Sequence, residues 1–310
     1  MRSDIYKLGI VGKGSQYNRI SKILRKKKIS YFLYKPNNTK YYDYKEFNKL
    51  KNCEIIFILS PNASHFNYIN KFYKNKYIFC EKPPVNSKKQ LSRIKKISHK
   101  KIYFNYNFRY STIGQILLNL RKYKLGDLLY ANIVSGHGLG FKKEYKKSWR
   151  SNIKFCKKGV FEIVSVHWVD LINYYFKILK IRKPSLINIL KKGSSYDNCY
   201  SKIYIKNNCE VDIFSSYSTP LVNKILFIFK NGLIEQNNNF IEIRSPALNL
   251  DKNNFFKKPK LIKKIKICFT RDYQLSLEKS VNYFLNVALN KKFFKKKDFD
   301  CSINSNKLIL

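Results

Sequence analysis

One residue of this 310-residue chain is placed where it could assist proton chemistry at the end of a strand. Lys82 lies in "FCEKPPV" (79–85), where an apolar run ends on a Glu-Lys pair followed by two prolines. A residue before proline is restricted to extended conformations, so we expect the Lys82 ammonium to project from the strand end with little freedom. An ordinary strand-to-turn exit would not need this charged pair.

A second candidate lies in "SVHWVD" (165–170), where His167 and Asp170 are three residues apart. Residues at this spacing are neighbours on a helix surface. An imidazole next to a carboxylate suits general acid–base chemistry, because the carboxylate fixes the tautomer and supports the charged ring. From these residues alone, a half-buried histidine paired with a structural aspartate is an equally good interpretation.

Gly12 and Gly14 follow the first apolar run directly. Glycines at this point let the backbone turn tightly and let a pyrophosphate approach the N-terminus of the next helix, which favours anions. The pattern is incomplete, because Tyr17 occupies the third glycine position and no acid follows the second strand. Lys35 stands there instead and could face a 2′-phosphate, which favours NADP slightly over NAD. A glycine turn without a ligand remains the alternative for this motif.

The elements that position these residues change character along the chain. The first third alternates strand-like and helix-like segments, which predicts a doubly wound parallel sheet. From Leu128 to Ser245 strand-like segments follow one another, and in the C-terminal half only 161–176 and 273–289 read as helices. We therefore predict a dinucleotide-binding domain at residues 1–121 and a mostly antiparallel α+β domain at residues 122–310.

The charge of the chain is extreme, with 63 Lys and Arg against 19 Asp and Glu, or +44. Such a balance is typical of proteins that bind nucleic acid or an anionic surface. However, the abundant residue types Lys, Asn, Ile, Tyr and Phe all have A/T-rich codons, and the lysines are spread along the whole chain. We favour a compositional bias and predict no specific nucleic-acid partner and no membrane partner.

Seven cysteines are scattered along the sequence without a C-x-x-C pair. Their odd number and spacing predict reduced thiols, and neither a disulfide framework nor a metal site. The apolar runs have the length of strands, and the N-terminus shows no long apolar signal region. These features favour a cytoplasmic protein.

Five motifs in this order resemble the Gfo/Idh/MocA family, that of glucose–fructose oxidoreductase and inositol dehydrogenase: "GIVGKG", "SPNASH", "CEKP", "YNFRYS" and "SVHWVD". The N-terminal motifs cover the first third of the chain, and the last one extends the resemblance into the second domain. The resemblance implies an α/β protein with an N-terminal Rossmann domain and a C-terminal domain built on a large open, mostly antiparallel sheet. It also implies oxidation or reduction of sugars and related polyols with NAD or NADP.

The resemblance assigns catalytic roles to Lys82 and His167. Many family members carry an acid four residues before that histidine, but Ile163 stands there in this chain. Glu162 is adjacent and would point about 100° away around a regular helix. The residues expected to bind the cofactor are Gly12, Gly14, Ser15, Gln16, Lys35, Ser60, Pro61, Asn62, His65, Glu81, Lys82 and Asn107.

The substrate side is expected to involve Lys82, His167, Asp170, Arg109, Trp149 and Arg150. Trp149 offers a stacking face and Arg150 a bidentate anion fork, which would suit a sugar nucleotide or an acidic sugar. A surface loop with a packed tryptophan is the alternative.

The sequence thus predicts an NAD(P)-dependent sugar or sugar-nucleotide oxidoreductase that forms a homodimer or homotetramer. The alternative is a non-catalytic relative that binds a ligand or partner without turnover. Tyr17, Ile163 and the absent strand-end acid favour that alternative.

Overall fold

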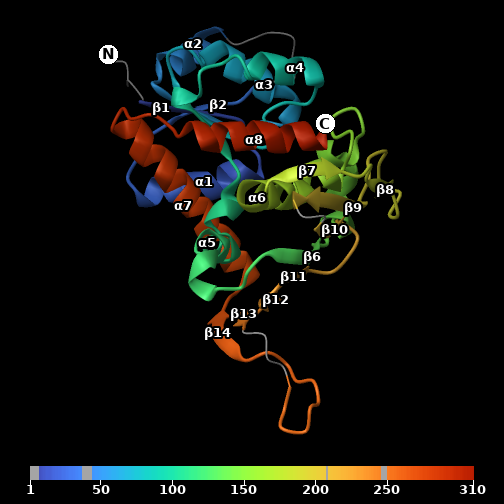
Figure 1. The fold of residues 1–310 in the computed structure, drawn as a ribbon. Helices are drawn as coiled ribbons and strands as arrows, with labels where there is room; N and C mark the ends of the chain where they lie inside the picture. Colours follow the sequence, from blue (N-terminus) through green and yellow to red (C-terminus); the bar gives the residue numbers. More distant parts are fainter. Residues whose placement is uncertain (1–6, 37–43, 207–208, 246–249) are drawn as a thin grey trace. The chain divides into compact units, whose positions relative to one another are not determined.

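The computed structural model describes residues 7–36, 44–206, 209–245 and 250–310 (Figure 1). The chain divides into two compact units, unit 1 with Met1–Asn107 and Leu277–Leu310, and unit 2 with Phe108–Ser276. This partition differs from the predicted division at residues 121 and 122, because the C-terminal segment returns to unit 1. Within the described ranges, no helix is both long and apolar enough to cross a lipid bilayer.

Unit 1 is built on a five-stranded parallel sheet in the order β2-β1-β3-β4-β5. Its strands are β1 (Leu8–Val11), β2 (Phe32–Tyr34), β3 (Ile55–Ile58), β4 (Tyr77–Glu81) and β5 (Ile102–Asn105). They alternate with α1 (Ser15–Lys26), α2 (Tyr44–Asn52), α3 (Asn62–Phe72) and α4 (Lys88–Ile94). In Figure 1, α2, α3 and α4 lie together on one side of this sheet, as right-handed crossovers require.

The strand order of unit 1 reverses next to β1. In doubly wound sheets, ligands bind outside the carboxyl ends of the strands at such a switch point. Here the switch point lies between β1 and β3, whose following turns carry Gly12 and Ser60. The predicted doubly wound sheet is therefore confirmed.

Two C-terminal helices complete unit 1, namely α7 (Phe269–Leu289) from Leu277 onward and α8 (Lys296–Ile309). Phe284 of α7 packs edge-on against Phe57 of β3 and Phe79 of β4, with ring centroids 5.1 and 5.3 Å away. All three rings are fully buried. Helix α8 was not predicted, because its apolar side chains alternate with many polar ones and give a weak helical pattern.

Unit 2 is built on a nine-stranded sheet in the order β14-β13-β12-β11-β6-β10-β9-β7, with β8 also paired to β9. The strands are β6 (Leu128–Gly136), β7 (Ile178–Ile181), β8 (Ser185–Ile187), β9 (Asn198–Ile205), β10 (Glu210–Ser216), β11 (Val222–Phe229), β12 (Gly232–Gln236), β13 (Phe240–Arg244) and β14 (Leu261–Lys266). Only the β6–β10 pair is parallel among the pairs described. The predicted fold class, with a large and mostly antiparallel second sheet, is confirmed.

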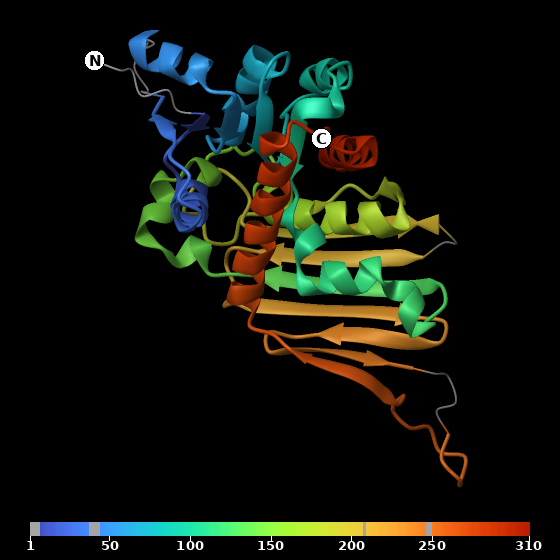
Figure 2. The ribbon, with the colours of Figure 1, turned by 90° about the vertical axis from the view of Figure 1, so that its left-hand side faces the viewer.

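One face of this sheet is covered by α5 (Thr112–Leu118) and α6 (Val166–Phe176), as Figure 2 shows. Side chains on the covered face are buried and apolar, such as Ile133 of β6 and Phe227 of β11. A segment predicted to be entirely helical, 161–176, begins instead with a π-helical turn at Phe161–Ser165.

Candidate functional site

The turn after β1 forms an open cradle at the start of α1. Gly12 has a φ of +97°, and a Cβ there would lie 2.9 Å from the Ser60 backbone, so only glycine fits without strain. Gly14 is the N-cap of α1 and makes no side-chain capping bond, and the first turn of the helix contains no acid. A Cβ at Gly14 would meet nothing within 4 Å. Ser15 begins α1, and the first N–H groups of a helix have no intrahelical partner, so the open space beside Gly14 fits a pyrophosphate.

The structure shows where the two residues that depart from the dinucleotide motif lie. Tyr17 turns its ring toward Tyr31, and the two hydroxyl oxygens lie 3.1 Å apart. The bulky residue at the third glycine position is thus directed toward the start of β2. Lys35 follows β2 and is exposed.

Glu81, at the end of β4, links three elements of unit 1. Its Oε1 accepts hydrogen bonds from Gln16 of α1, at 3.1 Å, and from Asn105 of β5, at 2.7 Å. Burial raises the pKa of the Glu81 carboxyl, while these hydrogen bonds and the neighbouring Lys82 work in the opposite direction. Glu81 and Gln16, two of the predicted cofactor contacts, therefore contact each other and fix the strand end beside α1.

His65 is fully buried in α3 and joins two turns. Its Nδ1 lies 2.8 Å from the Pro83 carbonyl oxygen, and its Nε2 lies 2.8 Å from the Ser60 carbonyl oxygen. Burial lowers the pKa of His65, although both carbonyl contacts oppose this shift. His65, predicted among the cofactor-binding residues, thus links the Ser60 and Pro83 turns from a buried position.

The other predicted residues of this turn are Pro61, which is the N-cap of α3, and Asn62, which begins that helix and is buried. The Ser60 hydroxyl oxygen lies 2.6 Å from that of Ser64.

Lys82 directly follows β4 and is 9% exposed, and its peptide bond to Pro83 is cis. The segment behind it is fixed by α8. Asn306 accepts a hydrogen bond from the Val85 N–H at 2.9 Å and donates one to the Val85 carbonyl at 3.1 Å. Asn107 follows β5 and is buried at the start of a 3-10 turn, Asn107–Tyr110.

In unit 2, His167 occupies the first turn of α6 and is 7% exposed. Its ring stacks on Phe108, with centroids 4.4 Å apart and an interplanar angle of 18°. This contact fixes the plane of the imidazole.

Asp170, predicted as the partner of His167, forms a buried ion pair with Arg109. The guanidinium donates to both carboxylate oxygens, at 2.7 Å from Nε and 2.6 Å from Nη2. The side chains are 8% and 1% exposed, and Arg109 also lies over the Tyr174 ring at 4.4 Å. Both residues were predicted to bind substrate, and the structure joins them to each other through this ion pair.

Trp149 and Arg150 lie together in a 3-10 turn, with the guanidinium 4.5 Å from the centre of the indole. Both are partly exposed. The positive charge of Arg150 works to lower the pKa of two buried tyrosines, Tyr145 and Tyr217, against the larger effect of burial, which raises them.

These two tyrosines, whose rings lie 5.9 Å apart, were not among the predicted residues. Neither hydroxyl has a hydrogen-bond partner in the described part of the chain. Nothing in the residue pattern marks them: Tyr145 lies in a short 3-10 helix, Lys143–Lys147, and Tyr217 directly follows β10.

A comparison with protein families finds one match. Residues 13–104 match the family described as "Oxidoreductase family, NAD-binding Rossmann fold", Gfo/Idh/MocA. No curated protein matches the chain by sequence.

Solved structures match nearly the whole chain at low sequence identity. A dehydrogenase (MviM) from Clostridium difficile is 16% identical with a TM-score of 0.71, covering 98% of this chain and 97% of the other. A myo-inositol dehydrogenase from Corynebacterium glutamicum is 13% identical with a TM-score of 0.70, covering 97% and 92%. A levoglucosan dehydrogenase in complex with NADH and levoglucosan is 12% identical with a TM-score of 0.74, covering 97% and 94%.

The fold defines a protein with a Rossmann-type domain and a second domain built on a large, mostly antiparallel sheet. Residues 13–104 thus match the Gfo/Idh/MocA family by sequence, in agreement with the motif resemblance, and the solved structures share the fold over nearly the whole chain.

Proposed function

We propose that the protein transfers a hydride between a nicotinamide dinucleotide and a hydroxyl or ketone carbon of a sugar or sugar nucleotide. One observation carries this proposal. The uncapped start of α1, the Ser60 turn and Lys82 all follow strands at the carboxyl edge of one parallel sheet. That edge is where doubly wound sheets bind dinucleotides.

The cradle fits the cofactor, which when bound supplies the hydride acceptor or donor at its nicotinamide. The N–H groups beside Gly12, Gly14 and Ser15 would hold the pyrophosphate. The exposed ammonium of Lys35 would face the adenosine ribose, where a 2′-phosphate distinguishes NADP from NAD. This supports a slight preference for NADP, and Lys35→Ala is expected to weaken binding of NADPH more than binding of NADH.

The proposed reaction uses two protonatable groups of the chain. Lys82 would hydrogen-bond the reacting hydroxyl, and its positive charge would lower the pKa of that hydroxyl. His167 would take the proton during oxidation and return it during reduction. The carbon loses a hydride and the oxygen loses a proton, so the alcohol becomes a ketone.

Trp149 and Arg150 support a substrate that combines a ring face with an anionic group. An indole can stack on a sugar ring, and a guanidinium binds a phosphate or carboxylate through two hydrogen bonds. Among the structural neighbours, one is named for myo-inositol and another is described in complex with levoglucosan. Both names agree with a polyhydroxylated substrate.

A turnover screen tests the proposal. Free sugars, polyols, acidic sugars and nucleotide sugars would be assayed with both oxidised cofactors by nicotinamide absorbance. We expect turnover with a polyhydroxylated compound, and loss of anionic preference in Arg150→Ala. Cofactor binding without turnover of any compound would favour the non-catalytic alternative. A cytoplasmic location belongs to the same proposal and is supported by seven free thiols.

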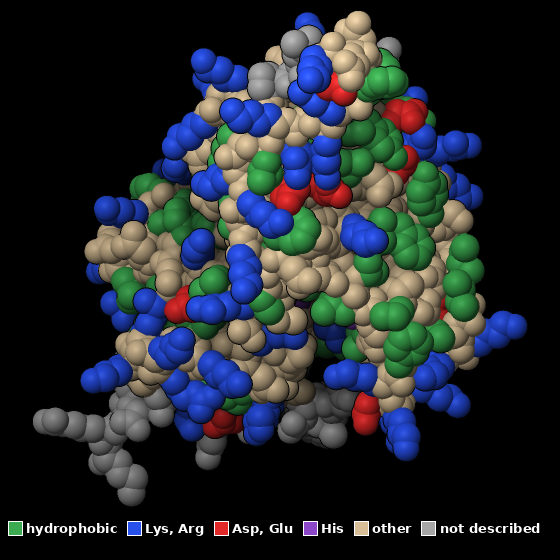
Figure 3. Space-filling view, turned by 90° about the horizontal axis from the view of Figure 1, so that it is seen from below, with side chains coloured by type: hydrophobic (Ala, Val, Ile, Leu, Met, Phe, Trp, Pro, Cys, Tyr) green, Lys and Arg blue, Asp and Glu red, His purple; other side chains and the backbone are tan. Residues whose placement is uncertain are grey.

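The open face of the unit 2 sheet supports self-association. Figure 3 shows Lys and Arg side chains spread over a face of the molecule with few acids. The open face of the unit 2 sheet has a more balanced charge than that face, because four acids lie on it beside basic residues. Strand register places Glu242, Glu235, Asp212 and Lys202 in one row across the sheet, and Glu210 beside Tyr130 on the same face.

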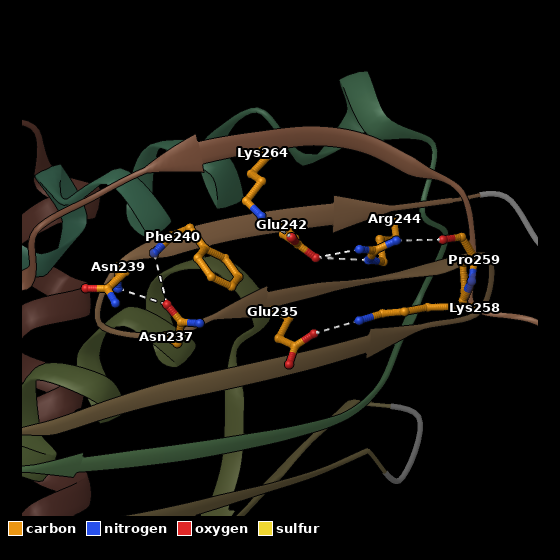
Figure 4. A network of polar contacts seen from close by, with 9 residues as sticks. All are labelled: Glu235, Asn237, Asn239, Phe240, Glu242, Arg244, Lys258, Pro259 and Lys264. Atoms are coloured by element: carbon orange, nitrogen blue, oxygen red, sulfur yellow. Dashed lines mark hydrogen bonds and ion pairs between the residues drawn. The ribbon is translucent and has the colours of Figure 1, made fainter.

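Two of these acids, Glu242 and Glu235, are shown paired with basic residues in Figure 4. Glu242 binds Arg244 at 2.6 Å and Lys264 at 3.0 Å, and Glu235 lies 3.7 Å from Lys258. A protein of charge +44 repels its own copies, so a face with balanced charge is the one best suited to meet a second copy. We therefore propose a homodimer or homotetramer through this face.

A further inference from the structure

Unit 1 contains a cavity at the edge of its sheet that lies opposite the α1 cradle. Helix α2 ends at Asn52, shortly before β3, and Lys76 directly precedes β4, so side chains from both places lie at the amino ends of these strands. The Gly12 and Ser60 turns follow strands and therefore lie at the carboxyl ends. The cavity has a volume of about 600 Å³, a size typical of small-molecule sites. It can thus hold a ligand separate from the dinucleotide.

Four lysines give this cavity a positive lining. Lys51 and Lys71 come from the last turns of α2 and α3. Lys74 and Lys76 come from the segment between α3 and β4. No acid is found among the described residues that line the cavity. A helix C-terminus carries roughly half a negative elementary charge, so the four ammonium groups outweigh the two helix ends and leave the lining positive.

The ring of Phe47 positions two of these lysines. The Nζ atoms of Lys71 and Lys51 lie 4.5 and 5.4 Å from its centre. Phe47 is itself buried and packs against Phe72, with ring centroids 5.9 Å apart, so the ring beside the two ammonium groups is fixed. Cations held near one ring raise the local positive potential, and an anion in the cavity reduces it. The packing therefore prepares a site for negative charge.

The acids of the neighbouring segments form ion pairs with lysines outside the cavity. The Glu46 carboxylate lies 2.9 Å from the Lys49 ammonium, and the Glu54 carboxylate lies 3.9 Å from that of Lys7. Neither pair places a carboxylate in the described lining. The lining is therefore suited to an anion with several charges, which would interact with more than one lysine at once.

We propose that this cavity binds a polyphosphate chain, either inorganic or attached to a nucleoside. An ammonium group is a compact point charge with three donors, which suits phosphate oxygens in many orientations. Linked phosphates concentrate several negative charges in a short chain, whereas a carboxylate supplies a single charge. The site uses neither the α1 cradle nor Lys82, so this proposal goes beyond the proposed function and does not depend on it.

Isothermal titration calorimetry at physiological ionic strength tests the site, with inorganic triphosphate and a nucleoside triphosphate as separate probes. We expect saturable binding of a single equivalent to the wild-type protein. The double variant Lys51→Ala/Lys71→Ala should bind about 10-fold more weakly, because two charge contacts are lost. The matched control is Lys88→Ala/Lys89→Ala, which removes the same charge from exposed positions of α4 and should leave the affinity unchanged.

The α1 cradle is another place where a phosphate chain could bind, and Gly14→Val separates the two sites. Binding of triphosphate should persist in Gly14→Val and in the presence of excess NADPH. Loss of binding in either case would place the triphosphate in the cradle and overturn the proposal. If NADPH itself does not bind, the dinucleotide site fails, and the lysine variants still decide this proposal.

The total charge of the chain, +44, is the remaining source of attraction for a polyanion. Equal weakening in the two double-lysine variants would show attraction to that total charge and would overturn the proposal. Absence of binding to the wild-type protein, or tighter binding of a single-stranded oligonucleotide than of either probe, would overturn it as well. Equal affinities for the two probes would assign the site to the phosphate chain alone, and tighter binding of the nucleoside triphosphate would assign it to the nucleotide.

Discussion

The candidate residues of unit 1 and those of unit 2 differ in how they are positioned. In unit 1, Gly12, Ser60 and Lys82 each follow a strand of one parallel sheet, so the backbone alone brings them to one edge. In unit 2, the side chains near His167 are positioned by contacts with residues that are distant in the sequence, and by one π-helical turn. Residues fixed by the backbone can be predicted from local sequence, whereas residues fixed by side-chain pairing cannot.

The largest expected effect is that of replacing Lys82, in unit 1, on turnover. Lys82→Ala should reduce turnover by about 10²–10⁴-fold, because the hydroxyl loses both its orientation and the charge that lowers its pKa. Dinucleotide binding, measured by nicotinamide fluorescence, should persist because the α1 cradle is unchanged. Lys89→Ala, at an exposed lysine of α4, is the matched control. Full turnover in Lys82→Ala would remove this residue from the reaction.

The ion pair of unit 2 should affect stability more than chemistry. Asp170→Ala leaves the Arg109 guanidinium buried without its carboxylate, which should lower the free energy of unfolding by about 3–5 kcal/mol. Replacing both residues with leucine should cost much less, because no charge remains buried. Urea unfolding of the three proteins checks this. Equal losses in the single and double variants would show that the pair acts through packing.

The two glycines of the cradle should respond differently. Gly12→Ala puts a side chain at a φ of +97° and within 2.9 Å of the Ser60 backbone, so we expect a loss of about 1–3 kcal/mol in unfolding free energy. Gly14→Ala meets open space and should change stability by less than about 0.5 kcal/mol. Thermal and urea unfolding distinguish the two, and a destabilising Gly14→Ala would show that the space is not open.

The smallest effect concerns the open sheet face. Arg244 and Lys264 lower the pKa of Glu242 by hydrogen bonding, so this acid stays ionised at neutral pH and is protonated only as the pH falls through its lowered pKa. Acidification then leaves the face with excess positive charge, and copies should dissociate. Sedimentation velocity at neutral and acidic pH checks this, with Glu242→Gln weakening association at neutral pH. Association that strengthens in acid would contradict the proposed interface.

Much of unit 1 could be predicted because its signals are short and local. The run after β1, the Pro61 turn and the Glu81-Lys82-Pro83 segment each mark a strand end directly, and alternation of elements gives the parallel sheet. The residues that hold these strand ends in place could not be recognised from the sequence. His65 gave no sign of joining the Ser60 and Pro83 turns, and Asn306 contacts Val85 from a helix far along the chain.

Unit 2 shows why the remaining residues could not be predicted. Spacing correctly placed His167 and Asp170 on one helix but could not show that Arg109, from a distant segment, takes the carboxylate. The π turn has no sequence signature, so Glu162 was assigned the geometry of a regular helix. Local spacing fixes which residues are neighbours on an element, and packing decides which partner each one takes.

The most direct test of the account is a fluorescence titration of the wild-type protein and Gly14→Val with NADH and NADPH in parallel. We predict that the wild-type protein binds at least one of the two, with NADPH favoured. We also predict that a valine in the open space beside the α1 N-terminus abolishes binding. Absence of binding to the wild-type protein at millimolar concentration, or unchanged binding to Gly14→Val, would contradict a dinucleotide site at this turn.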